Sequence, residues 1–276
     1  MSDPFALIHI SDPHFHRVPR RPAQWFSKRG LGALNLILRR ARLHPLERAE
    51  RLVRRLDGMD WQHLVITGDV TQLALEEEFA LARRVLEPLL ARGAERVTVL
   101  PGNHDRYVAQ PRDHFRAYFG EFFGEGEIAT KALTPRWHLA AWDSTEPTPP
   151  FMATGRVRAE TLKATEHWLA GLPEEARVIL ANHYPVRLPP SHGHRRHHDL
   201  VNRSEVRTWV DSRDIALYLH GHVHENWVLD VTERGRRQTH VNSASSTRLP
   251  KPHHRSAFHR ILLSQEGHRV EPLTLD

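Results

Sequence analysis

Short apolar runs, each ending in a small polar cluster, recur along the chain and are separated by segments with helical spacing. Such runs predict strands that are buried in a sheet and that present polar side chains at their carboxyl ends. Runs of this kind are found at 5–10, 63–67, 97–100, 137–142, 177–181 and 215–219. Their alternation with helical segments is typical of an α/β protein.

Between these runs, apolar residues recur at intervals of three and four, as they do on the buried face of a helix. In 76–92, for example, Phe79, Ala82, Leu86 and Leu89 share one face, and Gly93 follows as a C-cap. Further helices are expected at 46–56, 113–119, 159–172 and 204–212, and antiparallel strands at 227–231, 239–242, 257–263 and 270–275.

Length and composition narrow the class of protein. The 276 residues suffice for one large domain or two small ones, and no break favours two, so we expect one domain over 1–276. Cysteine is absent, so any metal ion must be held by nitrogen and oxygen ligands. The first residues lack the basic and apolar regions of a signal peptide, and no stretch is long enough to span a membrane. A cytoplasmic protein is therefore expected.

Positive charge is concentrated in the segment 17–55, which we interpret as an insertion. The formal charge is +6, but this segment has twelve Lys and Arg residues against two acidic ones, and the rest of the chain has a balance of −4. An ordinary crossover helix with a solvated basic face would explain it. Alternatively, it is a basic amphipathic insertion that contacts anionic lipid at the inner face of the membrane, or that steers an anionic substrate. Nucleic-acid binding is disfavoured because 31–38 is too apolar.

Five short motifs stand at the ends of the predicted strands. Each is a common turn sequence by itself, so the hypothesis of a site depends on their occurring together and in order. They are Asp12-Pro13-His14, Gly68-Asp69, Gly102-Asn103-His104-Asp105, Asn182-His183 and Gly221-His222-Val223-His224. Because the carboxyl ends of strands in an α/β sheet meet along one crevice, these side chains are expected to converge.

The motifs together offer two carboxylates, one amide and four imidazoles as metal ligands. These are Asp12, His14, Asp69, Asn103, His183, His222 and His224. Seven ligands are too many for one ion, but they suit two divalent cations that share a carboxylate and leave positions open for water and substrate. Asp69 is the expected bridge because it follows the second strand, between the others. With one residue between them, His222 and His224 project to the same side of an extended chain and can serve two neighbouring ions.

In this order, the motifs resemble those of the calcineurin-like metallophosphoesterase superfamily over residues 5–243. The resemblance implies a four-layer α/β/β/α sandwich of two mixed β-sheets flanked by helices, with the metal site at the carboxyl ends of the strands. It implies that one ion is held by Asp12, His14, Asp69 and His224, and the other by Asp69, Asn103, His183 and His222. It also implies that His104 is the catalytic histidine and that Asp105 is its orienting partner.

The implied activity is hydrolysis of a phosphoester at two metal ions. A hydroxide bridging the ions would attack phosphorus in line, while His104 donates a proton to the departing alkoxide. Mn, Fe and Zn are the metals expected for this donor set. The motif order looks most like that of bacterial class III cyclic nucleotide phosphodiesterases, so a small-molecule phosphodiester is the expected substrate.

Other functions stay open on the sequence alone. A related branch, the UDP-diacylglucosamine pyrophosphohydrolases, has a membrane-associated helical insertion, so 17–55 also suggests a pyrophosphohydrolase acting on a nucleotide-linked lipid. That branch commonly has Arg at the position of His104, which favours the phosphodiesterase. A nuclease or nucleic-acid-binding protein would use the same basic segment, and a non-catalytic scaffold would lack ligands, of which none is missing. The sequence makes no prediction of oligomeric state.

Overall fold

The computed structural model describes residues 4–20, 22–25, 28–30, 41–193, 196–250 and 257–275. Residues 31–40, the apolar part of the predicted insertion 17–55, lie outside this description. So do residues 194–195, in the histidine-rich loop that precedes α8.

Two mixed β-sheets form the centre of the protein. In the first, the spatial order is β11 (His268–Thr274), β10 (Ala257–Leu263), β1 (Phe5–Ile10), β2 (His63–Ile66) and β3 (Val97–Val99). In the second, it is β4 (Ile128–Ala132), β5 (Trp137–Trp142), β6 (Arg177–Ala181), β7 (Ile215–His220), β9 (Arg236–Ser243) and β8 (Asn226–Glu233). Strands β1, β2 and β3 run parallel, each paired with the next, and so do β5, β6, β7 and β9. Antiparallel pairs add β10 and β11 beside β1 in the first sheet, and β4 and β8 at the two edges of the second.

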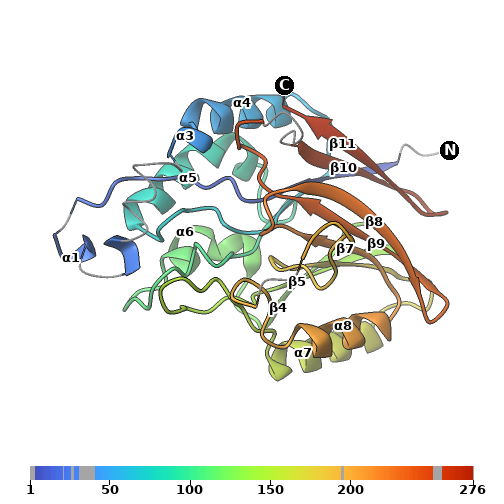
Figure 1. The fold of residues 1–276 in the computed structure, drawn as a ribbon. Helices are drawn as coiled ribbons and strands as arrows, with labels where there is room; N and C mark the ends of the chain where they lie inside the picture. The colour runs from blue at the N-terminus through green and yellow to red at the C-terminus, as the bar shows by residue number, and fades with distance from the viewer. Residues whose placement is uncertain are drawn as a thin grey trace.

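Helices cover the outer face of each sheet, as Figure 1 shows. On the first sheet lie α3 (Ala41–Leu43), α4 (Leu46–Asp57), α5 (Glu76–Leu90) and α6 (His114–Phe123), and on the second lie α7 (Ala159–Ala170) and α8 (Arg203–Asp211). The short helix α1 (Pro22–Trp25) stands apart from these layers (Figure 1). The predicted α/β/β/α sandwich is therefore confirmed.

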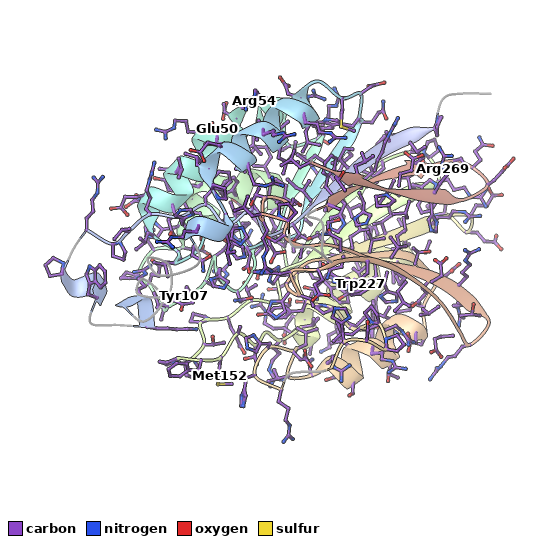
Figure 2. The ribbon with its side chains drawn as sticks, turned by 45° about the horizontal axis from the view of Figure 1, so that its top comes forward. Glu50, Arg54, Tyr107, Met152, Trp227 and Arg269 are labelled. Atoms are coloured by element: carbon purple, nitrogen blue, oxygen red, sulfur yellow. The ribbon has the colours of Figure 1, made fainter. Side chains whose placement is uncertain are left out.

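The inner strands of the second sheet are buried on both faces. On β5, Leu139 and Ala141 belong to the large core between the sheets, while Ala140 and Trp142 belong to the core under α7 and α8. Successive side chains of a strand point to opposite faces, so a strand between two cores needs apolar residues at both parities. Figure 2 shows side chains filling the layers, with Trp227 on β8 and Arg269 on β11 labelled on the two sheets.

The predicted buried strands are all present, with ends that differ by at most one residue. The edge strand β4 was not predicted, because only Ala129 of its five residues is fully buried and the segment shows no apolar run. The C-terminal hairpin of β8 and β9 is longer than predicted, with its turn at Arg234 and Gly235, both of positive φ.

Backbone hydrogen bonds join the loops that follow the parallel strands. The N–H of Asp12 donates to the carbonyl of Gly68 at 3.0 Å, and the N–H of Gly221 donates to the carbonyl of His183 at 3.0 Å. The loops after β1 and β2, and those after β6 and β7, are thus fixed relative to each other, and all lie at the carboxyl ends of their strands.

Buried neutral histidines make the stability of this fold depend on pH. Burial, assisted by the charge of Lys131, lowers the pKa of His63 on β2 from 6.5 to about 4. Its Nε2 atom lies 2.9 Å from Thr98 Oγ1. Below pH 6.5 the unfolded chain binds a proton that the folded chain does not, so stability falls as the pH falls from 6.5 to 4. The slope is up to about 1.4 kcal/mol per pH unit for one such group.

We therefore expect His63→Gln, which keeps a polar partner for Thr98 but cannot gain the charge, to lose less stability than the wild type over this pH range. Urea unfolding at several pH values measures the difference. A gap between the two proteins that does not change with pH would contradict this account.

Candidate metal centre

The structure brings all seven predicted ligands together at the carboxyl ends of the strands. One group comprises Asp12, His14, Asp69 and His224, and another comprises Asp69, His183 and His222; in each, the possible ligand atoms lie within 4.8 Å of one another. Asn103 joins the second group, since its Oδ1 atom lies 3.2 Å from His183 Nε2 and 2.9 Å from His222 Nδ1. The two groups share one residue, Asp69.

Asp69 lies between the groups. Its Oδ2 atom is 3.9 Å from Nε2 of His14, in one group, and 3.5 Å from Nε2 of His183, in the other. Its Oδ1 atom accepts a hydrogen bond of 2.7 Å from the backbone N–H of His104. One oxygen is thus held by the backbone while the other faces both groups, as a bridging carboxylate must.

Backbone carbonyls fix the tautomers of three imidazoles. Nδ1 of His14 lies 3.3 Å from the carbonyl of Thr71, Nδ1 of His183 lies 2.8 Å from that of Thr67, and Nε2 of His222 lies 2.6 Å from that of His198. A carbonyl can only accept, so each of these nitrogens carries the hydrogen. The other ring nitrogen, which faces the site, then has its lone pair available for a metal ion.

The lone pairs and carboxylate oxygens at the centre lie so close together that they repel one another unless positive charge lies between them. Nε2 of His14 and Nε2 of His224 are 2.9 Å apart, and Asp12 Oδ1 lies 3.2 Å from the latter. Asp12 Oδ1 is buried, and no described group donates a hydrogen bond to it. Two divalent cations would satisfy these atoms, and a set of imidazoles, carboxylates and one amide suits Mn, Fe or Zn. The residues present therefore fit the expected ions.

Five of the expected ligands have a strained backbone conformation. Asp12, His14, Asp69, His222 and His224 have φ between 50° and 72°, which makes them five of the eight non-glycine residues with positive φ in the described chain. The left-handed region costs such residues on the order of 1–3 kcal/mol each, and this strain is typical of functional sites.

Two motif glycines are required by close contacts around the ligands. A Cβ atom at Gly102 would overlap the carboxylate of Asp69, and one at Gly221 would overlap Ser11 Oγ and the carboxylate of Asp12. These glycines let one loop approach the ligand of another.

Burial lowers the pKa of the imidazoles at the centre, whereas a neighbouring carboxylate raises it. Burial, with the neighbouring His224, lowers the pKa of His14 well below 6.5, and burial with His183 does the same for the pKa of His222. Burial also disfavours a charge on His183, but the Asp69 carboxylate outweighs it and raises the pKa of His183 to about 9. Asp69 thus draws a positive charge, either a proton or a metal ion, to the Nε2 side of His183.

That Asp105 orients the His104 ring stays a prediction, since the hydrogen bonds seen at its carboxylate come from other groups. The Asp105 carboxylate accepts the backbone N–H groups of Val70, Thr71 and Gly102 at 3.1, 2.7 and 2.9 Å, and the Thr71 hydroxyl at 2.9 Å. With four donors around it, Asp105 clamps the loop after β3 to the loop after β2.

Gln72 contacts the ring of His104. Its backbone carbonyl oxygen lies 2.6 Å from Nδ1 of His104, closer than its side-chain amide nitrogen at 3.1 Å, so the ring carries a hydrogen at Nδ1. The ring also stacks on Tyr107, with centroids 5.3 Å apart and planes at 11°, and meets His14 edge-on at 5.0 Å. His104 is therefore positioned beside the ligand groups by a carbonyl and two rings.

Sequence reasoning missed Gln72, Tyr107 and the carbonyl of His198. Backbone carbonyls belong to every residue and leave no signal in a sequence. Tyr107 follows the central motif closely and could have been noticed as an aromatic neighbour of His104.

Comparison with known proteins agrees with this geometry. A family model described as calcineurin-like phosphoesterase matches residues 5–226. The chain belongs to the calcineurin-like phosphoesterase family. No curated protein matches its sequence.

Solved structures of low sequence identity share the fold. A dimetal phosphatase from Danio rerio is 14% identical, with a TM-score of 0.66 and complete coverage of both chains. Purple acid phosphatase PPD1 from yellow lupin (Lupinus luteus) is 11% identical, with a TM-score of 0.60; all of this chain is covered, and 52% of that one. A sulfate thiohydrolase, SoxB, from Thermus thermophilus is 14% identical, with a TM-score of 0.54; all of this chain is covered, and 57% of that one. The fold of this calcineurin-like phosphoesterase therefore does not fix the substrate.

The shared position of Asp69 predicts distinct metal stoichiometries for two variants of this calcineurin-like phosphoesterase. Asp69→Asn should lower the affinity for both ions, by more than the roughly 10–100-fold seen when residues that hydrogen-bond to metal ligands are removed. Asn103→Ala should lower the affinity only for the ion held with His183 and His222. Elemental analysis after metal loading and dialysis measures both. Loss of a single ion from Asp69→Asn would show that this carboxylate is not shared.

Proposed function

We propose that this protein is a binuclear metal-dependent phosphodiesterase. The observation that carries the proposal is the arrangement of two ligand groups around Asp69, with three imidazole lone pairs directed inward by backbone carbonyls. Bound there, two cations would lower the pKa of a water molecule toward neutrality and neutralise the charge of the phosphoryl oxygens.

The protein's own residues would position and protonate the substrate. Because Nδ1 of His104 donates to the Gln72 carbonyl, Nε2 is the nitrogen that can give up a proton when the ring is charged. In the proposed reaction, His104 donates that proton to the departing alkoxide, a contribution of about a hundred- to ten thousandfold. Asp105 keeps the loop that carries His104 fixed on the loop that carries Asp69.

A hollow beside His222 supports a diester rather than a bare phosphate. Its volume is about 520 Å³, and it is lined by Leu188, Ser191, His192, His198, Asp199 and His222, among others. This lies within the roughly 300–1,000 Å³ of small-molecule sites, so the second ester group of a phosphodiester has room there. Its wall carries the imidazoles of His192, His198 and His222 and the carboxylates of Asp199 and Glu225, so it suits a polar substrate group.

The expected phenotype of His104→Ala is a protein that keeps both metal ions but loses turnover. We expect kcat toward a nitrophenyl phenyl phosphate to fall about a hundred- to ten thousandfold. The loss should be greater for diesters with poor leaving groups, which depend more on protonation. His167→Ala, on the exposed face of α7, is the matched histidine control and should keep wild-type activity. Equal losses of metal content and rate would contradict this division of roles.

A second proposal concerns the membrane, and exposed apolar residues beside the basic segment favour it. Val18, Trp25 and Phe151 are exposed by 49%, 40% and 84%, and Arg17 and Arg20 are also exposed. Lys28 connects this region to the site, since its ammonium lies 4.4 Å above the ring of Tyr107 and 3.0 Å from the carbonyl of Met152. No helix in the described residues has the length and apolar character needed to cross a bilayer. We propose peripheral contact of this region with anionic lipid at the cytoplasmic face, which would also suit a lipid-linked pyrophosphate as an alternative substrate.

This contact predicts co-sedimentation with vesicles that contain phosphatidylglycerol and little with pure phosphatidylcholine. The double variant Val18→Ser with Trp25→Ser should bind several-fold less, because apolar side chains enter the interface. Val228→Ser, at an exposed residue of β8, is the control. Equal sedimentation of the double variant and the wild type would contradict the proposal.

A further inference from the structure

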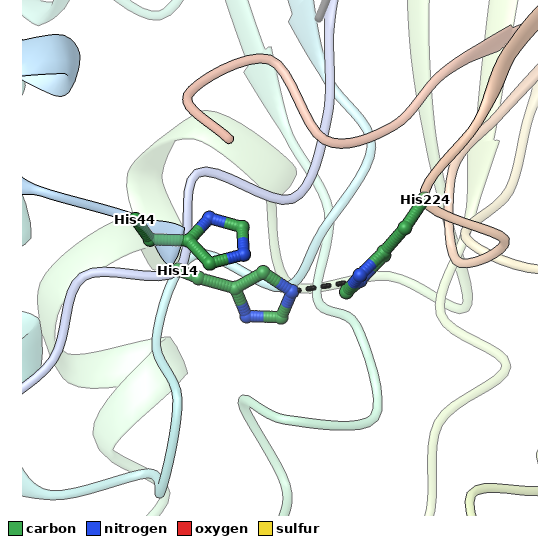
Figure 3. A group of neighbouring side chains, drawn as sticks. All are labelled: His14, His44 and His224. Atoms are coloured by element: carbon green, nitrogen blue, oxygen red, sulfur yellow. Dashed lines mark hydrogen bonds between the residues drawn. The ribbon is translucent and has the colours of Figure 1, made fainter. Parts of the chain in front are cut away.

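His44 is not among the seven ligands expected from the sequence, yet it lies at the metal centre. One of its ring nitrogens is within 4.8 Å of ring nitrogens of His14 and His224. Its ring centroid is 4.9 Å from that of His14, which it meets at 74°, and 6.1 Å from that of His224. Figure 3 shows the three rings together, each contributed by a different segment of the chain.

The position of His44 is fixed by the fold. It is 5% exposed and stands between α3 and α4, where Pro45 caps α4. The carbonyl of the preceding Leu43 accepts the N–H of Leu249 at 2.8 Å. The loop after β9 therefore holds this join of two helices against the site.

Two hydroxyls determine which nitrogen of His44 carries the hydrogen. Nδ1 lies 3.3 Å from Ser245 Oγ and 3.4 Å from Thr247 Oγ1. Ser245 donates its only hydroxyl hydrogen to the carbonyl of Asp12 at 2.9 Å, and Thr247 donates its own to the carbonyl of Pro13 at 2.8 Å. Both oxygens can then only accept from His44, so Nδ1 carries the hydrogen and the lone pair is on Nε2.

This is the arrangement of the expected ligands, in which one ring nitrogen donates to an oxygen and the other is left basic. The same hydroxyls also bind the Asp12-Pro13 backbone, which precedes His14. His44 and the first ligand motif are thus held by one set of bonds.

We propose that His44 is a further protein ligand, with His14 and His224, of the ion on the Asp12 side of the centre, an inference that rests on the proposed binuclear function. Since His44 is grouped with the two histidines and not with Asp12 or Asp69, its ring would move toward those carboxylates when the ion binds. The segment 17–55 then contributes directly to the metal centre. Binding of this ion would then depend on where the segment 17–55 is placed.

The test isolates this ion in the Asn103→Ala background, where the other ion is weakened. In that background, His44→Phe keeps an aromatic ring but has no nitrogen, and it should lower the affinity for Mn²⁺ or Co²⁺ about 10–100-fold. The d–d absorption of bound Co²⁺ should also change, which reports a lost nitrogen ligand independently of activity. His167→Ala in the same background is the control. Metal-free melting temperatures by circular dichroism check that each variant folds.

Retention of wild-type affinity and Co²⁺ spectrum by His44→Phe would overturn the inference. So would a loss of affinity in His44→Ala that His44→Phe fully restores, because the ring would then act by packing alone. If the wild-type protein binds two ions and His44→Phe changes neither affinity nor spectrum, only the inference about His44 fails and the proposed function is unaffected. A wild-type protein that binds fewer than two ions would overturn the proposed function itself.

Discussion

The metal centre depends on hydrogen bonds between backbone carbonyls and imidazole rings. The carbonyls of Thr71, Thr67 and His198 each hold a ring hydrogen on the outer side of a histidine. The inner nitrogens then present lone pairs to one another and to the carboxylates, an arrangement that is unfavourable unless positive charge lies among them. Affinity for cations therefore comes from the backbone as much as from the ligand types.

This arrangement persists because the loops behind it are joined to each other. Asp105 accepts four hydrogen bonds that tie the loop after β3 to the loop after β2, and Asp12 is bonded to the carbonyl of Gly68. Five ligands are held in the left-handed region at a cost of on the order of 1–3 kcal/mol each. Loops without these bonds would relax into lower-energy conformations and separate the ligands. The parallel strands provide the rigid base, since each delivers its ligand at the same edge.

The sequence predicted what depends on periodicity and on residue type. Buried strands appear as apolar runs, and motifs such as Gly221-His222-Val223-His224 carry side chains whose chemistry is specific, so the strands and the side chains that gather at their ends could be predicted. The edge strand β4 could not, because one of its faces is solvated and irregular. The roles of Asp105 and Gln72 could not be separated either, since both follow from loop geometry. His44 was concealed within a basic segment whose composition suggested a solvated surface.

The contact of His104 Nδ1 with a carbonyl, in place of a carboxylate, changes how the orientation and charge of this ring are set. A carboxylate at Nδ1 would follow the charge of the ring, whereas the Gln72 carbonyl mainly fixes its tautomer and direction. The orientation of His104 then depends on stacking with Tyr107, and Lys28 also lies over the ring of that tyrosine. The segment 17–55 thus reaches the site at two points, through Lys28 toward His104 and through His44 toward His14. With the roles proposed for His104 and His44, a substrate or membrane that displaces this segment would affect proton donation and metal ligation together, which would couple contact at the surface to turnover.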